Sequence, residues 1–316
     1  MLEAGLILYL IAMLTMAGIY AVMVLGLNLQ WGAGGLFNVG IAGFFGIGAY
    51  TSAILTTASS SRHLGGFELP IAVGLAGAII TSGIVAWAIG RVCLRLRSDY
   101  LAIATIGIAE ILRLILKNEQ WMTNGALGIG HIPRPFEELP QGYSQLGFLA
   151  VVLCLVAAVY WLWQRALAGP WGRTMRAIRD NEHAAAAMGK DIEAYRLQAF
   201  VLGSMAMGLG GALMAHHSKF MGPEAIEPVQ TTFLVWVMLI VGGQGNNRGA
   251  VLGALVVWMI WSGTQLLTTQ LPPEWSNRAG YLRVFLIGLC LQIVLQRFAQ
   301  GILPQRMGRP AERQPV

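Results

Sequence analysis

The sequence predicts an all-α protein, a polytopic bundle of about nine transmembrane helices, on the strength of three observations. Hydrophobic residues make up 56% of the 316 residues and charged residues only 11%, whereas a soluble domain carries about 25% charged residues. The mean hydropathy is +0.61. Apolar runs of about 20 residues recur from one end of the chain to the other, and each is long enough to cross the hydrocarbon core as a helix.

The apolar runs place the expected spans in order near residues 5–28, 36–57, 69–93, 99–117, 147–165, 197–217, 229–243, 250–270 and 280–299. The first run lacks a basic leader and a small-residue cleavage site, so we expect it to be retained. The second overlaps the glycine-rich stretch QWGAGGLFNVGIAGFFGIGAY, which begins at residue 30. Because glycine destabilises a helix interior, we expect this span to be broken or re-entrant, and the total count to fall between eight and ten.

Basic residues gather on one side of the predicted bundle. Fourteen of the 21 Lys and Arg residues fall in loops and span ends that lie on the same side if the chain crosses the membrane once in each predicted span. By the positive-inside rule this side is cytoplasmic, which places the C-terminus inside and the N-terminus outside a bacterial inner membrane. The fourteen are Arg91, Arg95, Arg97, Arg165, Arg173, Arg176, Arg179, Lys190, Arg196, Arg248, Arg297, Arg306, Arg309 and Arg313.

The longest cytoplasmic segment, residues 166–196, is too polar to insert into the bilayer and is predicted to form one or two short surface helices. Asp180 is the expected N-cap of the helix that contains four successive alanines. Gly189 is expected to end that helix, because glycine readily adopts the left-handed conformation that follows a helix.

An apolar ridge and a basic ridge precede this helix. Met175 and Ile178 are three residues apart on one face, while Arg173, Arg176 and Arg179 are spaced by three on another. Such a shape suits docking into a groove on a partner protein. The alternative is a basic helix that rests on anionic lipid headgroups.

Four polar residues fall within or beside the predicted spans. Glu110 and Arg113 are three residues apart on one helical face, so they are expected either to pair with each other or to line a pathway for solute. Asn28 and Asn38 flank the expected glycine-rich break. Their amides would hydrogen-bond a passing solute or hold the broken segment together.

Several kinds of site are missing from the sequence. The three lysines, Lys117, Lys190 and Lys219, do not follow a phosphate-binding G-x-x-x-x-G-K-[ST] motif, so energy for transport would come from another subunit or from a gradient. The basic residues do not share one amphipathic face, which argues against nucleic-acid binding. No paired nucleophile and base and no metal-ligand spacing is found in the spans, so we expect no catalytic residue and no metal site.

Four stretches, in order along the chain, resemble the permease subunits of ABC importers for branched-chain amino acids, and the second points to the LivM-type subunit. The third is similar to the cytoplasmic EAA loop of that family, with Glu182, the alanines and Gly189 at matching positions. His183 and Lys190 depart from that pattern, because both are polar. The stretches are GLNLQWGAGGLFNVGIAGFFGIGAYTSAIL, RLRSDYLAIATIGIAEILRLILKNEQWMTNGALGI, RAIRDNEHAAAAMG with YRLQAFVLGSMAMGLGGALMA, and LIVGGQGNNRGAVLGAL.

This resemblance implies that residues 166–196 are a coupling loop that inserts into a cleft on an ATP-binding subunit. By position, the implied coupling residues are Arg176, Arg179, Asp180, Glu182 and Gly189, the charged ones fixing the register through ion pairs. Because an exposed ion pair contributes less than ~1 kcal/mol, the geometry of the loop matters more than its charge.

The function implied by the resemblance is that of a permease subunit of an ATP-driven importer for branched-chain or other hydrophobic amino acids. The implied partners are ABC ATPase subunits that bind ATP, a second related permease, a periplasmic binding protein, the small-molecule substrate and membrane lipid. Residues 1–299 would form the permease domain and residues 300–316 a cytoplasmic tail, with no cofactor on this chain. The alternative is a secondary transporter or facilitator for a small neutral solute, such as urea or a short amide, with Glu110 in ion coupling.

Overall fold

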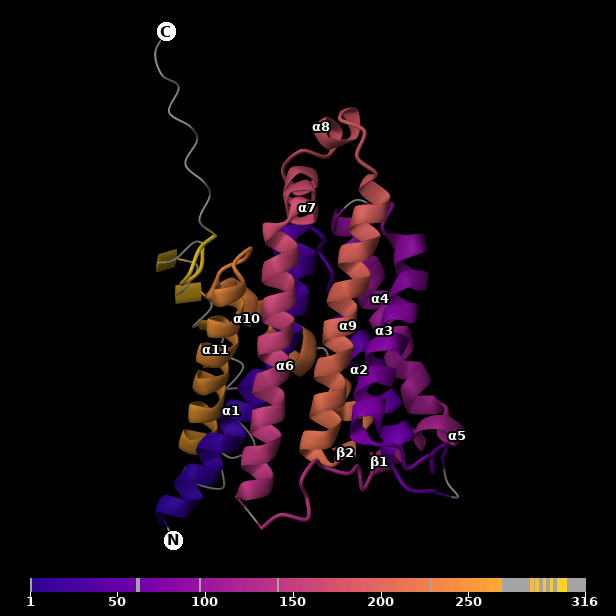
Figure 1. Cartoon of the computed structure of the whole chain (residues 1–316), viewed down its shortest axis with the longest axis vertical. Coiled ribbons are helices and arrows are strands. Elements are labelled where there is room, and N and C mark those ends of the chain that lie inside the picture. Colours follow the sequence, from indigo (N-terminus) through magenta and orange to yellow (C-terminus); the bar gives the residue numbers. More distant parts are fainter. Residues whose placement is uncertain are drawn as a thin grey trace.

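The computed structural model of the chain describes residues 2–60, 63–96, 98–140, 142–227, 229–268 and 300–305, with four residue pairs between 285 and 297. The long helices lie side by side in a bundle (Figure 1). In the described part, four helices are long and apolar enough to cross a membrane: Gly5–Ala33, Ile71–Cys93, Tyr143–Ala168 and Ile192–Ser218. The predicted helical membrane bundle is therefore confirmed, whereas the count of about nine spans is not.

The described elements begin with α1 (Leu2–Leu27), the π-helical η1 (Asn28–Ala33), α2 (Ile41–Thr56), α3 (Ile71–Cys93), α4 (Ser98–Asn118), α5 (Gln120–Thr123), the 3-10 helix η2 (Gly125–Leu127) and strand β1 (Ile129–Gly130). They continue with α6 (Tyr143–Ala168), α7 (Pro170–Asp180), α8 (Glu182–Ala187), α9 (Ile192–Ser218), β2 (Phe220–Met221), η3 (Pro223–Ile226), η4 (Val229–Phe233), α10 (Leu234–Gly242) and α11 (Asn247–Thr268). The predicted span at 280–299 lies mostly outside the described residues.

The glycine-rich second run is broken, as its composition predicts. Residues 34–40 leave the helix after η1, and α2 has only 16 residues. Gly35 has a φ of +68°, a conformation that is strained for residues with a Cβ. We call residues 34–40 the break. Non-helical backbone at membrane depth must be buried in protein or line a cavity, so the break is a candidate wall of a pathway.

Two short helices, α2 and α10, begin near each other inside the bundle. The backbone N–H of Ala42, in the first turn of α2, donates to Thr232 Oγ1 at 3.2 Å, in the π-helical turn that leads into α10. From this junction α2 runs towards the strands β1 and β2, and α10 runs towards the turn that leads into α11. The side chain of Thr232 thus satisfies one of the N–H groups that the start of α2 leaves without an intrahelical partner.

Small residues allow the central helix α9 to pack closely against α1, α2 and α3. A Cβ at Gly211 would meet the backbone of Phe45 on α2, and a Cβ at Gly203 would meet the backbone of α1. Gly249 and Gly253 bring α11 into similar contact with α10. Packing through small residues is the usual way for membrane helices to approach each other, and none of these glycines lines the cavity described below.

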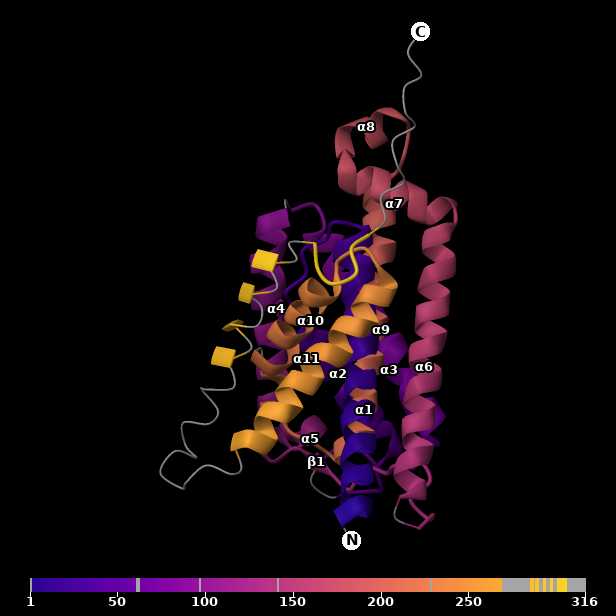
Figure 2. The same ribbon diagram turned by 90° about the vertical axis from the view of Figure 1, so that its left-hand side faces the viewer.

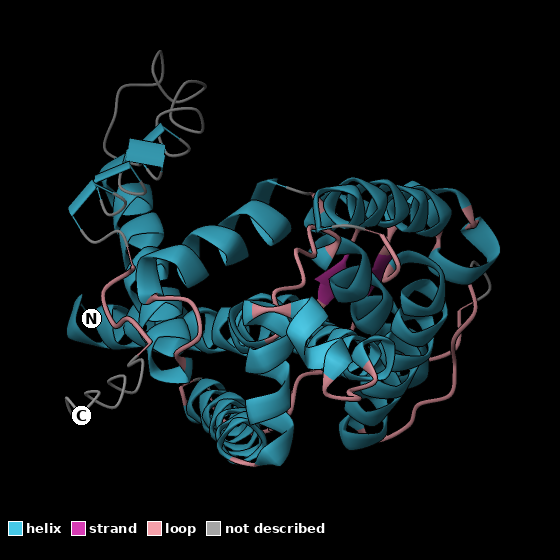
Figure 3. Ribbon diagram, turned by 90° about the horizontal axis from the view of Figure 1, so that it is seen from above, coloured by secondary structure: helices cyan, strands magenta, loops and turns pink. Residues whose placement is uncertain are grey.

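The two ends of the bundle are built differently. At one end α7 crosses the ends of the long helices and α8 lies beyond it (Figure 2), and an Arg95–Glu193 ion pair of 3.4 Å joins the end of α3 to the start of α9. At the other end β1 and β2 pair antiparallel, with Ile129 opposite Met221. Seen from above, the long helices are viewed nearly end-on and these strands are the only described sheet (Figure 3).

Candidate functional site

The apolar ridge of α7 packs on the chain's own bundle, which corrects the expectation that it docks into a partner. Met175 is fully buried and Ile178 is 1% exposed. Gly34 is the first residue of the break. A Cβ added to it would lie only 2.7 Å from the Cε methyl group of Met175. The sequence pattern identified the buried face correctly. It could not say whether a partner or the same chain covers that face.

Two of the predicted coupling arginines also make contacts within the chain. Arg179 donates from Nη1 to the backbone carbonyl of Gly32 at 2.5 Å and to Gln305 Oε1 at 3.1 Å, and its Nε lies 3.0 Å from Asp180 Oδ1. Arg176 donates to the carbonyl oxygen of Leu167 at 3.1 Å, at the end of α6. Arg179 therefore fastens α7 to the last turn before the break.

The helix α8 begins one residue later than predicted. Asn181, not Asp180, is the N-cap, and its side chain accepts a hydrogen bond from the N–H of Ala184 at 3.0 Å. Asn and Asp are equally good caps, so the sequence left the choice between adjacent residues open. Gly189 follows the end of the helix with a φ of +73° and its N–H bonds the carbonyl of Ala186, so the predicted glycine stop is confirmed.

The predicted coupling residue Glu182 forms an ion pair inside the loop. Its two carboxylate oxygens accept hydrogen bonds from Arg196, at 3.0 and 2.7 Å, which tie the start of α8 to the start of α9. Of residues 181–191, only Ala185 is buried, and Met188 is 78% exposed. The structure therefore presents α8 as a fixed, outward-facing tip. A contact of Asp180 or Glu182 with an ATPase stays a prediction.

Asn28 and Asn38 hold the broken segment together, which is one of the two roles predicted for them. Both are fully buried. Asn28 donates to Asn247 Oδ1 at 2.8 Å, and Asn38 donates to Gln30 Oε1 at 2.9 Å. Gln30 in turn donates to Ser204 Oγ on α9 at 3.1 Å. Buried amides need such partners, so these side chains fix the break. A contact of either side chain with a solute stays a prediction.

Sequence reasoning missed Gln30, Ser204 and Asn247 as partners in this network. All three are polar residues inside or beside apolar runs, which is the signal that selected Asn28 and Asn38. Polarity alone does not reveal which of several buried polar side chains face one another across helices that are distant in sequence.

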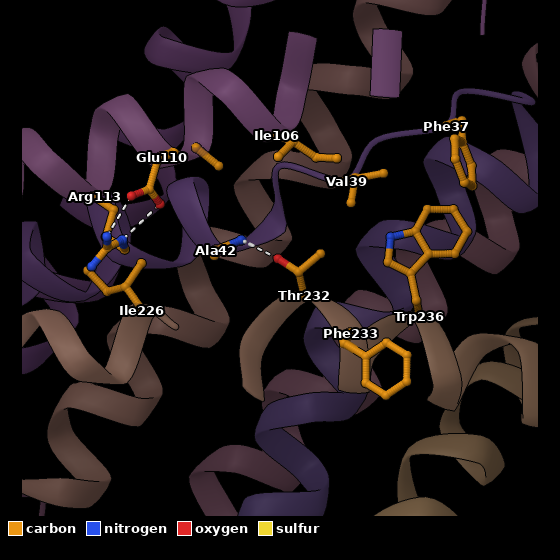
Figure 4. A pocket seen from close by; sticks show the side chains of 11 residues that line it. Phe37, Val39, Ala42, Ile106, Glu110, Arg113, Ile226, Thr232, Phe233 and Trp236 are labelled. Atoms are coloured by element: carbon orange, nitrogen blue, oxygen red, sulfur yellow. Dashed lines mark hydrogen bonds and ion pairs between the residues drawn. The ribbon is translucent and has the colours of Figure 1, made fainter. Parts of the chain in front are cut away.

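A cavity of about 500 Å³ opens beside the break, between α4 and the start of α10 (Figure 4). Glu110 and Arg113 lie at one end of it, and the predicted pairing is confirmed: Arg113 Nε and Nη2 lie 2.9 and 2.5 Å from the two carboxylate oxygens. The Glu110 side chain is 43% exposed, so the cavity is open on one side. Its lining residues are Phe37, Val39, Ala42, Ile106, Ala109, Glu110, Arg113, Ile226, Thr232, Phe233 and Trp236.

Aromatic rings line the other end of the cavity. Phe37 and Trp31 each contact Trp236, with ring centroids 4.6 Å apart in both pairs. The indole N–H of Trp236 donates to the backbone carbonyl of Asn38 at 3.2 Å. Phe37 belongs to the break and Trp31 to the turn before it. Phe37 and Trp31 thus belong to the segment that α7 holds, whereas Trp236 belongs to α10.

The loop between β1 and α6 is fixed to the end of α9, at the end of the bundle opposite α8. Glu137 forms an ion pair with Lys219, and Arg134 donates to the carbonyl oxygen of His217. The hydrogen bond from Lys219, and then that from the backbone N–H of Arg134, hold the pKa of Glu137 below its usual range. A charged Glu137 therefore helps to order this surface at neutral pH.

Comparison with known proteins gives the family. The branched-chain amino acid transport system / permease component family matches residues 9–295. The high-affinity branched-chain amino acid transport system permease protein LivM of Escherichia coli K12 is 30% identical over 95% of this chain and 70% of its own length. The nucleoside ABC transporter permease protein NupC of Lactococcus lactis is 25% identical, over 85% of this chain and 88% of its own. The permease protein LivH of E. coli K12 is 23% identical, over 88% and 91%.

No solved structure matches the chain with significance. The family match nevertheless covers most of the sequence, and its members are transport components. The predictions of a permease subunit and of a protein that is not an enzyme are therefore confirmed. The chain belongs to the branched-chain amino acid transport permease family.

Proposed function

We propose that this permease is one membrane subunit of an ATP-driven importer, and that its cavity forms part of the pathway for branched-chain or other hydrophobic amino acids. One observation carries the proposal: the surface helix α7 is fastened to the segment that forms the cavity wall. Arg179 binds the carbonyl of Gly32, and Phe37 and Val39, a few residues further along, line the cavity. A displacement of α7 would therefore move the wall of the pathway.

The helix α8 is the part of the coupling loop that docks on an ATPase subunit. Met188 at its end is 78% exposed, and the exposed alanines beside it make a small apolar tip. A methionine side chain is flexible and fills irregular grooves on partner proteins. ATP would bind to that partner, because this sequence has no phosphate-binding motif.

A second, related permease covers the open side of the cavity. Ionised side chains at membrane depth cost roughly 3 kcal/mol or more when they face hydrocarbon, so the half-exposed Glu110 and its partner Arg113 would not lie against lipid. LivM and LivH of E. coli, both similar to this chain, are two differently named permeases from one organism. Their existence supports pairing with a second permease.

In this assembly the α8 end faces the cytoplasm of a bacterial cell. The basic residues of α7 and of the neighbouring helix ends support that orientation through the positive-inside rule. The C-terminus then lies in the cytoplasm, residues 166–196 form the coupling loop of a permease domain at 1–299, and residues 300–316 form a tail. A periplasmic binding protein would deliver substrate to the opposite end.

The proposal is tested by purifying the tagged chain from its native membrane in mild detergent and reconstituting the purified assembly in liposomes. We expect an ATP-binding subunit to co-purify and uptake of leucine to require ATP. Leucine uptake in ATP-free liposomes by the chain alone would establish a facilitator instead. ATP-dependent uptake of uridine without uptake of leucine would retain the importer but replace its substrate class.

A variant of the α8 tip tests the docking surface. Met188→Asp places a charge in the proposed apolar contact, and we expect at least about tenfold weaker recovery of the ATPase subunit. The matched control is Leu96→Asp, since Leu96 is 42% exposed in the turn before α4 and is not part of α8. Equal recovery of the ATPase with both variants would contradict docking through α8.

A further inference from the structure

The cavity is chemically divided along its length (Figure 4). One end carries the Glu110–Arg113 pair, and the other end is walled by Phe37, Phe233 and Trp236. Among the lining residues, Glu110 and Arg113 are the only charged side chains. A small molecule that fills the cavity would therefore need charges of both signs at one end and an apolar group at the other.

The ion pair keeps hydrogen-bonding capacity for a ligand. An arginine side chain has five N–H donors in a planar arrangement, and Arg113 uses Nε and Nη2 to bond Glu110. Each Glu110 oxygen accepts one of these bonds, and a carboxylate oxygen has a second lone pair. The pair is also accessible, because the Glu110 and Arg113 side chains are 43% and 24% exposed.

We propose that this ion pair recognises the zwitterionic backbone of a free amino acid. The substrate's α-carboxylate accepts hydrogen bonds from the remaining N–H groups of Arg113, and its α-ammonium group donates to Glu110. The aliphatic side chain then lies against the aromatic end of the cavity. This assignment rests on the proposed function, because it names the chemistry by which the same pathway selects its substrate.

Charge balance explains why a zwitterion fits here. A zwitterion and an ion pair together have no net charge, and each of the four charges has an oppositely charged neighbour. An analogue with only the amine or only the carboxylate would bring an unbalanced charge into a mostly apolar cavity, where incomplete pairing is costly. The site therefore distinguishes an amino acid from an amine or a fatty acid of the same shape.

The strength of the interaction also suits transport. Ion pairs that remain partly exposed are weak because water competes for both partners, so a substrate held this way is released readily. The apolar walls add favourable burial in proportion to the aliphatic area of the substrate. They contain no group that would pair with a charged side chain, so the same cavity disfavours acidic and basic amino acids.

The test uses the purified complete transporter and measures binding of radiolabelled leucine in competition with two analogues. Leucinamide lacks the carboxylate, and 4-methylpentanoate lacks the amine. For the unaltered protein we expect each analogue to compete at least about tenfold more weakly than leucine. Arg113→Gln should weaken leucine binding about tenfold or more and leave leucinamide binding little changed. Glu110→Gln should weaken leucine binding and leave 4-methylpentanoate binding little changed.

Two further variants guard against a general loss of structure. Glu119→Gln removes a carboxylate that follows α4 and bonds Trp121 outside the cavity, and we expect it to bind leucine normally. Removing both charges, with Glu110→Gln and Arg113→Gln together, leaves two neutral polar side chains at these positions, so the protein should fold but no longer prefer leucine over leucinamide and 4-methylpentanoate. A double variant that keeps the full preference for leucine would overturn the proposal.

The failure of this inference is distinguishable from the failure of the proposed function. Suppose that leucine is taken up with ATP, while Arg113→Gln and Glu110→Gln bind leucine and both analogues as tightly as the unaltered protein does. In that case only the zwitterion site is wrong. If the unaltered transporter neither binds nor carries leucine, the substrate class itself is wrong.

Discussion

Arg179 is the residue that connects the surface of the protein to its interior. Its guanidinium group reaches the carbonyl of Gly32 and the side chain of Gln305 from the last turn of α7. The sequence indicated that Arg179 belongs to a coupling loop, but the spacing of basic residues suggested that it faces a partner. An arginine side chain is long enough to reach either way, and only the fold decides which carbonyl is in range.

Replacing Arg179 tests this connection. In Arg179→Ala the Gly32 carbonyl loses a charge-assisted hydrogen bond, which is worth about 1.5–3 kcal/mol. We expect leucine uptake per ATP hydrolysed to fall about tenfold, with the ATPase still bound. Arg173→Ala, on the exposed side of the same helix, is the control and should transport normally. A loss of uptake that is equal in both variants would contradict a specific role for Arg179.

The coupling loop shows, at the scale of an element, what local sequence can predict. The prediction that Gly189 ends α8 follows from backbone sterics alone and is confirmed. The N-cap of α8 is Asn181 and not the predicted Asp180. The amphipathic pattern of α7 predicted a buried face containing Met175, and that face is buried. Its covering surface comes from the break, more than a hundred residues earlier in the chain, so no local pattern could identify it.

The end of α8 is expected to depend on the backbone conformation of Gly189. A β-branched residue in the left-handed region is strained by roughly 1–2 kcal/mol, and Gly189→Val should therefore disturb the turn that presents Met188. We expect less uptake per ATP hydrolysed, with normal insertion of the protein in the membrane.

Asparagine provides the matched substitution at this position, because it tolerates the left-handed conformation better than other residues with a Cβ. Gly189→Asn should retain most of the transport, and space is available, since no atom lies within 4 Å of the added Cβ. If valine is tolerated as well as asparagine, the shape of this turn does not govern coupling.

At the scale of the whole molecule, hydropathy predicted the helices well and their roles poorly. The runs at 36–57 and 229–243 become short helices that begin near each other at the Ala42–Thr232 hydrogen bond. This junction, the break and α4 together form the cavity. Composition indicated the break through its glycines, but the cavity depends on tertiary pairing between distant segments.

Under the proposed function, we expect the cavity to communicate with one side of the membrane at a time. The aromatic rings of Phe37 and Trp236 line the end formed by the break, and the ion pair lies at the other end. Because α7 holds the segment that carries Phe37, nucleotide-driven movement of the coupling loop would shift that aromatic wall. In the proposed orientation, the pathway would then open towards the cytoplasm.

The most direct test of this account measures the labelling of a single cysteine in the cavity by a membrane-impermeant maleimide, added from either side of the reconstituted transporter. Ile106→Cys, in a chain whose own cysteines are replaced, lines the cavity, whereas Ile103→Cys is 68% exposed on the same helix and does not. The account predicts that nucleotide binding changes the side from which position 106 is labelled and leaves position 103 unchanged. Labelling of position 106 from the same side at the same rate with and without nucleotide would contradict it.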